Sequence, residues 1–308
     1  MILTVTMNPA IDKTYTTDGL MPGTVNRMKT SVNIPGGKGI NVSRLLRLFH
    51  IPVTATGFLG GYNGKFIEDK CKEQGIICEF VKIEEETRSS INVIGDDGYV
   101  TEILEPGPGI SVREKEEFLG TYKNLIKETE LVVIAGSVAK GAGEDFYKNL
   151  IEMAHLNHIK VFLDTSGDAL MYGVDAAPYL IKPNLKELEY LLGQQIKTDS
   201  QIKDAITILH NKGIEKIVVS LGSKGIIYGD GTKVLKAKPP KIDAVNTVGC
   251  GDSVVASYVL SYLNKEDDET ALKRAIAISA AHATTMENGN LPMELIQEYM
   301  EKIEIKSI

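Results

Sequence analysis

The segment NTVGCGDS at residues 246–253 is the strongest local signal for chemistry in the sequence. Its glycines precede an apolar run that is expected to be helical. Backbone N–H groups at the start of a helix point toward an anion, and the helix dipole favours negative charge there. Asp252 would repel a phosphate if it were only a ligand, but in the same turn it could take a proton from an attacking hydroxyl group. An Asp in the first turn of an ordinary helix explains the pattern equally well, so both interpretations stay open at this point.

A second glycine-rich segment, PGGKGIN at residues 35–41, places Lys38 among glycines at the start of an expected helix. An anion or a polyhydroxyl ligand could approach the backbone closely there. The segment does not match the nucleotide-binding P-loop, and neither it nor GGYNGKF at residues 60–66 fits GxGxxG. Taken alone, residues 36–39 are better explained as an ordinary loop between a strand and a helix.

Two further loops follow expected strands. PNLKE at residues 183–187 has Asn184 and Glu187 three apart, which is the pattern of a helix capping box. The same spacing would also put an amide and a carboxylate on one turn, where a magnesium-bound phosphate could lie, although the capping role is favoured. SLGSKG at residues 220–225 ends a strand in a flexible loop that suits a nucleotide and any other turn alike.

Other patterns exclude several kinds of site. The histidines occur without HExxH and the sequence has no GxSxG, so zinc and serine hydrolases lack their motifs. The three cysteines form no CxxC pair, which argues against a disulfide framework or structural zinc and indicates a reducing compartment. Cys250 lies beside the expected anion site, but without a local activating histidine its expected role is a small apolar filler.

The elements that must position these residues alternate between strand and helix along the chain. Near-continuous apolar strands between helices predict an α/β fold with a mostly parallel sheet, helices on both faces, and ligands beyond the carboxyl ends of the strands. The strands are expected at residues 2–7, 53–59, 131–135, 161–163, 179–181 and 217–220. The helices are expected at residues 39–49, 66–73, 144–155, 185–192, 254–263, 271–285 and 293–302.

Residues 13–35 and 87–104 interrupt this alternation. They are rich in Thr, Val, Ile and Ser, with glycine turns and little helical periodicity. We expect them to form a small β-sheet, inserted in two pieces, that acts as a lid. Asp12, Arg27 and Arg88 lie in or beside these segments, but isolated arginines are usually solvated, so each alone is a weak candidate ligand.

The composition is that of a folded, acidic protein. The 308 residues are 43% hydrophobic and 24% charged, with a net charge of −7. These values exclude a disordered chain, a collagen-like fibre and a coiled coil, and without a basic block we expect no nucleic-acid partner. No window approaches the ~18 consecutive apolar residues of a membrane span, and the N-terminus lacks the basic region of a signal peptide, so we expect a soluble cytoplasmic protein with no membrane partner.

In combination, the motifs resemble the ribokinase-like carbohydrate kinases of the phosphofructokinase B type. The resemblance covers essentially the whole chain as one kinase domain, residues 1–308, and rests on eight segments in the order that the family shows. These are TMNPAID, GGKGINVSRLL, TR at 87–88, EPGPGIS at 105–111, AGS at 135–137, KPNLKELE at 182–189, VSLGSKG and TVGCGDS. The resemblance implies a ribokinase-like fold, ATP as co-substrate, Mg²⁺, and phosphoryl transfer to a sugar.

The resemblance also implies roles for individual residues. Asp252 matches the family's catalytic base, and backbone N–H groups beside it would hold the γ-phosphoryl group, a type of contact worth ~3–4 kcal/mol in related chemistry. Asn184 and Glu187 match the motif that organises Mg²⁺ through water. The γ-phosphoryl set is Gly249, Cys250 and Gly251; the nucleotide set is Ser220, Gly222, Ser223, Gly225, Asn246, Gly249 and Gly251; the sugar set is Asp12, Gly37, Lys38, Asn41 and Ser137.

Three cations are expected to hold a phosphate that the sugar already carries. They are Arg27, Arg88 and Lys38, because guanidinium forks in particular suit phosphate oxygens. The resemblance therefore implies ATP-dependent phosphorylation of the free primary hydroxyl of a ketohexose monophosphate. We expect fructose-1-phosphate, which would give fructose-1,6-bisphosphate, first, and tagatose-6-phosphate, which would give tagatose-1,6-bisphosphate, second.

The sequence departs from the fructose-1-phosphate branch after the TR motif. Ser90 and Asn92 stand where that branch usually has Asn and Lys, and Leu104-Glu105 is closer to the tagatose-6-phosphate branch. In contrast, GGKGINVSRLL and NTVGCGDS favour the fructose-1-phosphate branch.

Two other classes of protein are alternatives to a kinase. A non-catalytic sugar-phosphate sensor on the same fold would be expected to lose the base or the glycines, and both are present. A dinucleotide-dependent oxidoreductase would need GxGxxG after the first strand, where the sequence has Met7-Asn8-Pro9-Ala10. The lid resembles those that dimerise in relatives, so a homodimer through the lid is expected by analogy.

Overall fold

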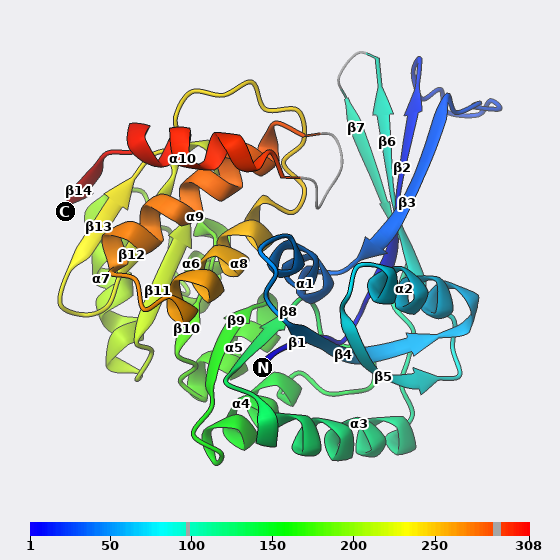
Figure 1. The fold of residues 1–308 in the computed structure, drawn as a ribbon, viewed down its shortest axis with the longest axis horizontal. Coiled ribbons are helices and arrows are strands. Elements are labelled where there is room, and N and C mark those ends of the chain that lie inside the picture. Colours follow the sequence, from blue (N-terminus) through cyan, green and yellow to red (C-terminus); the bar gives the residue numbers. More distant parts are fainter. Residues whose placement is uncertain (97–98, 286–290) are drawn as a thin grey trace.

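A ten-stranded sheet runs through the centre of the protein, and a separate four-stranded sheet projects from it (Figure 1). The computed structural model describes residues 1–96, 99–285 and 291–308. The strand order of the large sheet is β14-β13-β12-β11-β10-β9-β8-β1-β4-β5. Its strands are β1 (Ile2–Thr6), β4 (Val53–Gly60), β5 (Ile77–Ile83), β8 (Leu131–Ala135), β9 (Lys160–Asp164), β10 (Leu180–Ile181), β11 (Lys216–Ser220), β12 (Ile226–Gly229), β13 (Val234–Ala237) and β14 (Ile305–Ser307).

The large sheet is parallel from β11 to β5, and the strands from β11 to β14 pair antiparallel. β1 lies inside the sheet, where Ile2 pairs with Val53 of β4 on one side and with Leu131 of β8 on the other. The predicted α/β fold with a mostly parallel sheet is therefore confirmed. In such a sheet, ligands bind beyond the carboxyl ends of the strands, near the point where the strand order reverses.

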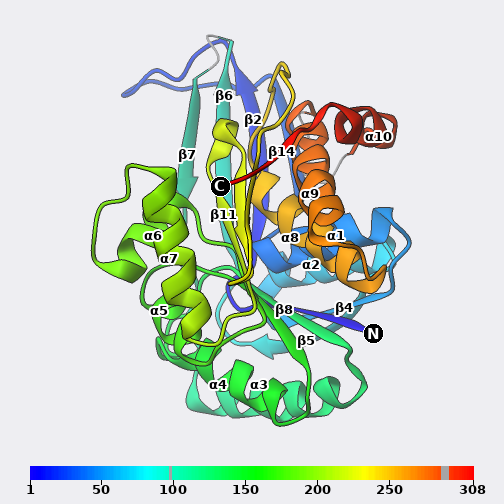
Figure 2. The same ribbon diagram turned by 90° about the vertical axis from the view of Figure 1, so that its left-hand side faces the viewer.

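Helices cover both faces of the large sheet (Figure 2). Leu131 and Val133 of β8 belong to the core beneath one set of helices. Val132 and Ile134 belong to the core on the opposite face, so the whole strand is buried and apolar. The first face carries α1 (Lys38–Leu48), α2 (Gly61–Glu73), α8 (Cys250–Leu263), α9 (Asp268–Ala283) and α10 (Met293–Lys302). The second face carries α3 (Val112–Leu125), α4 (Phe146–His155), α5 (Gly167–Asp175), α6 (Leu185–Leu192) and α7 (Asp199–Asn211).

The small sheet has the strand order β3-β2-β6-β7. Its strands are β2 (Ala10–Thr17), β3 (Thr30–Gly36), β6 (Arg88–Gly95) and β7 (Val100–Leu104). The predicted small sheet in two pieces is thus confirmed, although β2 begins at Ala10, before the predicted boundary, because it follows β1 after a short turn. Residues 97–98 of the second piece lie outside the described residues. β7 is exposed along its whole length.

Several helix boundaries differ from the sequence prediction. α8 begins at Cys250 and α2 at Gly61, earlier than the expected residues 254 and 66, because glycines with low helix propensity form their first turns. α3, α5 and α7 are absent from the predicted set, although capping boxes mark the starts of α3 and α7. Within the described ranges, no helix combines the length and the apolar character that crossing a membrane requires.

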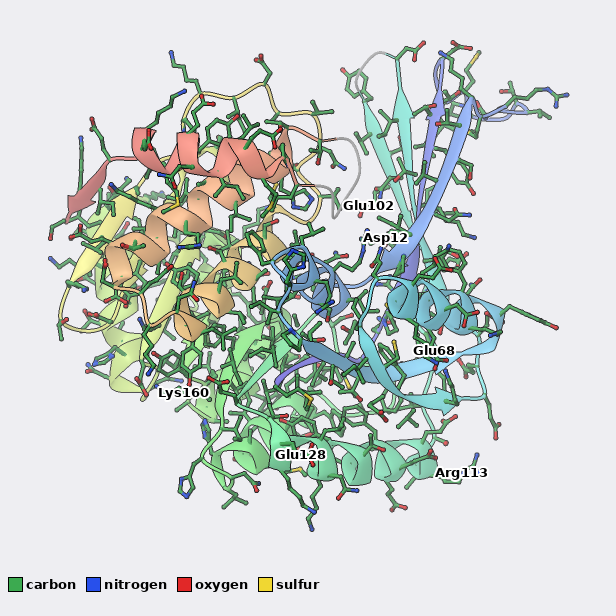
Figure 3. The ribbon with its side chains drawn as sticks, in the orientation of Figure 1. Asp12, Glu68, Glu102, Arg113, Glu128 and Lys160 are labelled. Atoms are coloured by element: carbon green, nitrogen blue, oxygen red, sulfur yellow. The ribbon has the colours of Figure 1, made fainter. Side chains whose placement is uncertain are left out.

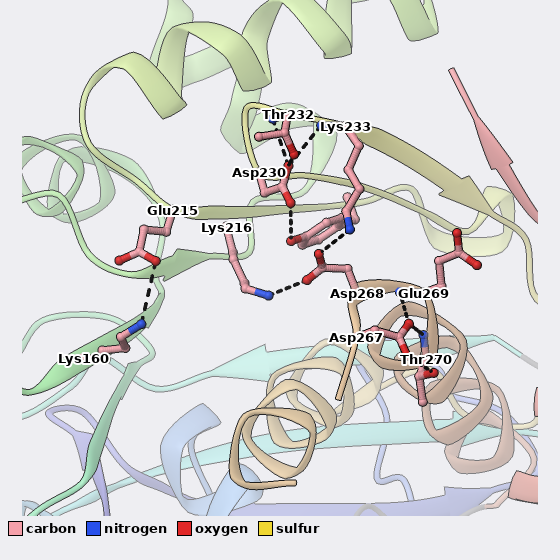
Figure 4. A network of polar contacts seen from close by, with 11 residues as sticks. Lys160, Glu215, Lys216, Asp230, Thr232, Lys233, Asp267, Asp268, Glu269 and Thr270 are labelled. Atoms are coloured by element: carbon pink, nitrogen blue, oxygen red, sulfur yellow. Dashed lines mark hydrogen bonds and ion pairs between the residues drawn. The ribbon is translucent and has the colours of Figure 1, made fainter. Parts of the chain in front are cut away.

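A polar network fastens the antiparallel edge of the large sheet to α9 (Figure 4). Asp268, the first residue of α9, pairs with the ammonium groups of Lys216 and Lys233. Burial would raise the pKa of Asp268, but hydrogen bonds from these lysines and from Tyr228 lower it to about 2. The carboxylate therefore stays ionised near neutral pH. It holds α9, and with it the neighbouring α8, against the strands.

Candidate active site

The amino end of α8 is the centre of the candidate site. Gly249 caps this helix with a φ of 81°, a left-handed conformation that glycine adopts without the steric cost of a Cβ atom. The first N–H groups of a helix have no acceptor within the helix, so they can bind an anion. The N–H of Cys250 donates to the carbonyl of Thr247 at 3.3 Å. The N–H groups of Gly249 and Gly251 are therefore the stronger anion donors of the predicted γ-phosphoryl set.

Asp252 lies in this first turn with only 5% of its surface exposed. The side-chain amide of Asn41 in α1 donates a hydrogen bond of 2.7 Å to its Oδ2. Burial and, after it, the carboxylate of Asp164 raise the pKa of Asp252 to about 7, against the opposing effects of two lysines and the Asn41 bond. A carboxyl group with a pKa near neutrality is suited to accept a proton from a hydroxyl group.

Asp164, at the carboxyl end of β9, holds two ammonium groups beside Asp252. Its Oδ1 lies 3.1 Å from the Nζ of Lys38 and 3.3 Å from the Nζ of Lys182. Asp164 is 1% exposed, and its Oδ2 has no hydrogen-bond partner among the described residues. A buried charge is costly unless it is paired, so the carboxylate and the two lysines depend on one another.

Lys182 brings its positive charge to the amino end of α8. Its Nζ lies 3.4 Å from the position that a Cβ atom on Gly251 would take, and Lys182 is 6% exposed. Neither Lys182 nor Asp164 was singled out from the sequence, although Lys182 belongs to the KPNLKELE segment. The available signal was that both residues directly follow expected strands, 179–181 and 161–163, at the edge where ligands bind.

Asp12 of the predicted sugar set lies where the small sheet meets the main body, and Figure 3 labels it together with Glu102 of β7. A Cβ atom on Gly36 of β3 would lie 2.2 Å from the Asp12 Cγ, so only glycine allows this approach of the two strands. Burial raises the pKa of Asp12 to about 6, although Arg44 and Arg88 lower it. The Glu102 carboxylate raises it. Asp12 is therefore a poorly solvated carboxylate near two guanidinium groups.

Arg88 opens β6 and pairs with Ala10 of β2, close to Asp12. Its Nη1 donates to the carbonyl oxygen of Glu105 at 3.4 Å. Its Nε is buried and has no hydrogen-bond partner in the described part of the chain. A guanidinium group with an unused buried donor is suited to bind a phosphate.

Ser137 of the sugar set follows β8 and is tied to β1 through Asn8, a residue not singled out as a site residue from the sequence. The side-chain amide of Asn8 donates to the Ser137 Oγ at 3.0 Å. Gly107 lies so close that a Cβ atom there would be 2.3 Å from the Asn8 Oδ1. Asn8 thus connects the loops that follow β1 and β8, and the Gly107 backbone packs closely against it. Gly37, with a φ of 109°, directly precedes α1, which carries Lys38 and Asn41 of the same set.

Arg27 is not brought together with the other phosphate-binding candidates within one chain. It lies in the connection between β2 and β3, beyond the Thr16–Thr30 pair. Arg88 pairs with Ala10 at the opposite end of β2. At ~3.3 Å per residue, the length of β2 between these pairs is roughly 20 Å.

A cavity of about 530 Å³ opens at the amino end of α8, within the range of ~300–1,000 Å³ usual for small-molecule sites. The predicted nucleotide loop lines it, as do apolar residues of the 239–244 segment, α8 and α9. The lining members of the predicted sets are Ser220, Gly222, Ser223, Gly225, Cys250 and Gly251. Asn246 is not among the described residues that line the cavity. Its Oδ1 accepts a hydrogen bond of 3.0 Å from the N–H of Val248, which shapes the turn before α8. The neighbouring Thr247 lines the cavity.

Asn184 and Glu187 form the capping box of α6, the structural role favoured from the sequence. The Asn184 Oδ1 accepts from the Glu187 N–H at 2.9 Å, and the Glu187 Oε2 accepts from the Asn184 N–H at 2.8 Å. Asn184 also bridges to Ser220 at the start of the nucleotide loop. Burial lowers the pKa of Lys38, but the carboxylates of Asp164, Asp252 and, after them, Glu187 raise it above its ordinary value, so Glu187 lies in the neighbourhood of this site.

The oxygen donors at this site fit Mg²⁺ bound mainly through water and phosphate. Among the described residues, no three His, Cys, Asp or Glu side chains form a metal cage. The buried Oδ2 of Asp164, without a hydrogen-bond partner among the described residues, is nevertheless available near the amino end of α8, where Lys182 pairs with the same carboxylate. Mg²⁺ usually keeps several waters and takes one or two carboxylates together with substrate phosphates. The residues present therefore fit this ion.

Comparison with known proteins identifies similar proteins over the whole chain. The family model described as pfkB family carbohydrate kinase matches residues 5–294. A curated tagatose-6-phosphate kinase from Staphylococcus epidermidis is 38% identical over 308 residues, which cover 99% of this chain and 99% of that protein.

Solved structures share the fold. A structure named possible 1-phosphofructokinase from Thermotoga maritima has a TM-score of 0.91 and 28% identity, covering 100% of this chain and 99% of its own. The tetrameric inhibited form of phosphofructokinase-2 from Escherichia coli has a TM-score of 0.89 and 25% identity, covering 98% of each chain.

Proposed function

The chain belongs to the pfkB family of carbohydrate kinases, which are phosphotransferases with an alcohol group as acceptor, and on this premise we propose that it transfers the γ-phosphoryl group of ATP to the free primary hydroxyl of a ketohexose monophosphate. The observation that carries the proposal is the position of Asp252. This buried carboxyl group, with a pKa of about 7, shares a helical turn with an anion-binding helix end. A cavity of nucleotide size opens at the same helix end.

In the proposed reaction, Asp252 accepts the proton of the sugar hydroxyl. The hydroxyl oxygen forms a bond to the γ-phosphorus while the bond from that phosphorus to the β,γ-bridging oxygen breaks, and ADP leaves. The N–H groups of Gly249 and Gly251 and the Lys182 ammonium group stabilise negative charge on the transferred group. The hydrogen bond from Asn41 orients the base.

Mg²⁺ would be held by the nucleotide phosphates and water, with Asp164 and Glu187 as the protein carboxylates. When bound, the ion supplies neutralisation of phosphate charge. Asn184 would act indirectly, because its side chain caps α6 and holds the Glu187 backbone. This division of roles agrees with the capping box that the two residues form.

The phosphate that the sugar already carries would bind to Arg88 and Lys38. Arg88 has a buried Nε without a partner in the described ranges. Burial lowers the pKa of Lys38, but the carboxylates of Asp164 and Asp252 raise it above its ordinary value, so the side chain remains an ammonium group. Arg88 acts on Asp12, which would bind a sugar hydroxyl, and Lys38 lies beside Asp164. Two cations at this site favour a sugar phosphate over a free sugar.

Two ketohexose monophosphates are candidates, and we place tagatose-6-phosphate first. The full-length relative that is 38% identical carries that name, and Leu104-Glu105 resembles that branch. Fructose-1-phosphate, favoured by the GGKGINVSRLL and NTVGCGDS motifs, is the second candidate and is supported by the Thermotoga maritima structure at 28% identity. A ketohexofuranose carries a CH₂O group at each end, so one site could accept either compound.

The test is ADP release with a panel of acceptors: tagatose-6-phosphate, fructose-1-phosphate, fructose-6-phosphate and the unphosphorylated ketohexoses. We expect the highest kcat/KM with tagatose-6-phosphate and a far lower value with the free sugars. A higher value with fructose-1-phosphate would reverse the order of the two candidates. Binding of a phosphosugar without ADP release from any acceptor would identify a non-catalytic sensor and overturn the proposal.

We further propose that two copies associate through their small sheets. β7 is an edge strand of the small sheet and exposes Val100, Ile103 and Leu104 by 57%, 49% and 57%, and an exposed apolar edge strand favours pairing with another chain. Arg27, which is remote from Arg88 in its own chain, could then serve the sugar site of the second copy. Light scattering of the wild type and of Ile103→Lys tests this association. We expect the mass of two chains for the wild type and of one chain for the variant, and a wild-type mass of one chain would contradict the proposal.

A further inference from the structure

The amino end of α2, formed by the GGYNGKF segment, is occupied by the carboxylate of Glu86. The Glu86 Oε1 accepts from the N–H of Asn63 at 2.6 Å, and its Oε2 accepts from the N–H of Tyr62 at 3.3 Å. Gly61 has a φ of 64°, and a Cβ atom there would lie 2.0 Å from the Glu86 Oε2. Gly61 therefore leaves room for the Glu86 carboxylate, an anion from the protein itself. This carboxylate accepts hydrogen bonds from first-turn N–H groups and interacts favourably with the helix dipole.

The next residue, Thr87, is fixed to the same helix end. Its N–H donates to the Gly60 carbonyl at 3.0 Å, and its Oγ1 accepts from the Gly60 N–H at 2.9 Å. The side-chain amide of Asn63 donates to the Thr87 carbonyl at 2.7 Å. Glu86 is thus held on the amino end of α2 by its side chain, and Thr87 by both its backbone and its side chain.

Arg88 follows this attachment directly and has little freedom of its own. On its other side, the N–H of Ser89 donates to the Glu105 Oε2 at 2.7 Å. Within the described part of the chain, the Arg88 guanidinium, in contrast, donates one long hydrogen bond of 3.4 Å, to the Glu105 carbonyl. The backbone that carries Arg88 is therefore held on both sides, while its guanidinium remains available for a ligand.

We propose that Glu86 is a positioning residue for phosphosugar binding: its carboxylate holds the 86–88 segment on the amino end of α2 so that the Arg88 guanidinium faces the phosphate of the sugar. The inference rests on the proposed role of Arg88 in binding that phosphate. A carboxylate suits this position better than a neutral side chain, because its hydrogen bonds to N–H groups are charge-assisted and the helix dipole adds to them. Glu86 itself is exposed, so its replacement leaves the hydrophobic core intact.

The experiment compares Glu86→Ala and Glu86→Gln with a matched control, Glu84→Gln. Glu84 lies two residues away, and among residues 1–96, 99–285 and 291–308 its side chain makes only an exposed ion pair with Arg113, so its replacement removes the same charge without releasing the segment. We expect Glu86→Ala to raise the KM for the phosphosugar by about tenfold while kcat and the KM for ATP stay within about twofold, because small misplacements of a binding group are costly. Glu86→Gln should have a smaller effect, and Glu84→Gln none.

A double-mutant cycle with Arg88→Ala separates positioning from a general structural role. If Glu86 acts through Arg88, the Glu86→Ala effect on KM should disappear in the Arg88→Ala background. Additive effects, or equal effects on both substrates, would overturn the inference. If Arg88→Ala alone leaves the KM unchanged, the proposed phosphate site fails. If Arg88→Ala raises it and Glu86→Ala does not, only the positioning role fails.

Discussion

The side-chain amide of Asn41 donates a hydrogen bond of 2.7 Å to the Oδ2 of Asp252, across 211 residues of sequence. This bond joins the first turn of α1 to the first turn of α8. One member of the predicted sugar set is thereby brought into contact with the candidate base. It also determines which carboxylate oxygen of Asp252 is engaged by the protein, so the orientation of the base is built into the fold.

Asp252→Asn should abolish turnover while nucleotide binding remains nearly intact. The substitution preserves the size of the side chain but removes the group that accepts the proton. Loss of a general base lowers rates by roughly 10²–10⁴-fold. Steady-state kinetics would measure kcat, and a value above a tenth of that of the wild type would show that the assignment is wrong.

Thermal stability provides the control for this variant. Because the pKa of Asp252 is raised from 3.8 to about 7 in the folded protein, its ionisation disfavours folding above pH 7 and has no effect below pH 3.8. The neutral amide escapes this penalty. The variant should therefore be at least as stable as the wild type at pH 8, so that lost activity cannot be attributed to unfolding.

The activity should rise with pH as Asp252 loses its proton. Only the ionised carboxylate can act as a base, and burial raises its pKa to about 7. We expect kcat/KM to increase tenfold per pH unit well below this value and to level off above it. A pH profile that is flat between pH 5.5 and 8 would contradict the role of Asp252 as a base of this pKa.

Arg88→Ala should raise the KM for the phosphosugar much more than the KM for ATP. A charge-assisted contact to phosphate is worth ~1.5–3 kcal/mol, so the loss should be on the order of 10- to 150-fold. Arg27→Ala, tested separately, should act in the same direction if a second copy supplies this residue. Equal effects on both substrates would indicate a folding defect or an incorrect assignment of the small sheet.

Lys182→Met should lower kcat by about 10²-fold, the effect of losing one donor to the developing charge. The Lys182 ammonium group lies at the amino end of α8, the proposed anion site, and pairs with Asp164. Lys182→Arg is the control that keeps the charge and should retain more activity. A variant with normal kcat and reduced melting temperature would assign Lys182 a purely structural role, since breaking a buried ion pair destabilises a protein.

The small sheet should become more protected from hydrogen exchange when the phosphosugar binds. Apart from Thr87 and Ser89, whose N–H groups are already hydrogen-bonded, residues 13–35 and 87–104 are expected to exchange amide hydrogens quickly in the free enzyme and slowly with phosphosugar, because a lid that is held by substrate contacts has low local stability. The strands at residues 131–135 and 217–220 should stay protected throughout. If the lid segments are already as protected as those strands, closure is not coupled to binding and a rigid, dimerised sheet is the better description.

The large sheet could be predicted because its central strands are buried on both faces and are therefore uniformly apolar, as LVVIA in β8 shows. β5 escaped prediction because it lies at an edge and mixes Glu79 and Lys82 with its apolar residues. α3 escaped because it buries few side chains, chiefly Phe118 and Tyr122. Periodicity is a weak signal where burial is partial.

Only those residues of the candidate site that lie within local sequence motifs could be predicted. Lys182 and Asp164 meet because β9 and β10 are neighbours and their carboxyl ends lie at the same edge. No local pattern in the sequence encodes that adjacency. The separation of Arg27 from Arg88 likewise follows from the length and register of β2, which composition alone does not specify.

The position of β1 between β4 and β8 has a consequence for the chain while it is being synthesised. β1 gains its first neighbour once residues 53–60 have emerged, and its second only after residue 135. Contacts between distant segments slow folding, and chains fold from the N-terminus as they grow. Asp252, the partner of Asn41, is synthesised later still, as part of α8. A nascent chain that is halted before residue 250 would thus carry the residues proposed to bind the sugar phosphate but no base, and transferase activity would begin only when nearly the whole chain has been made.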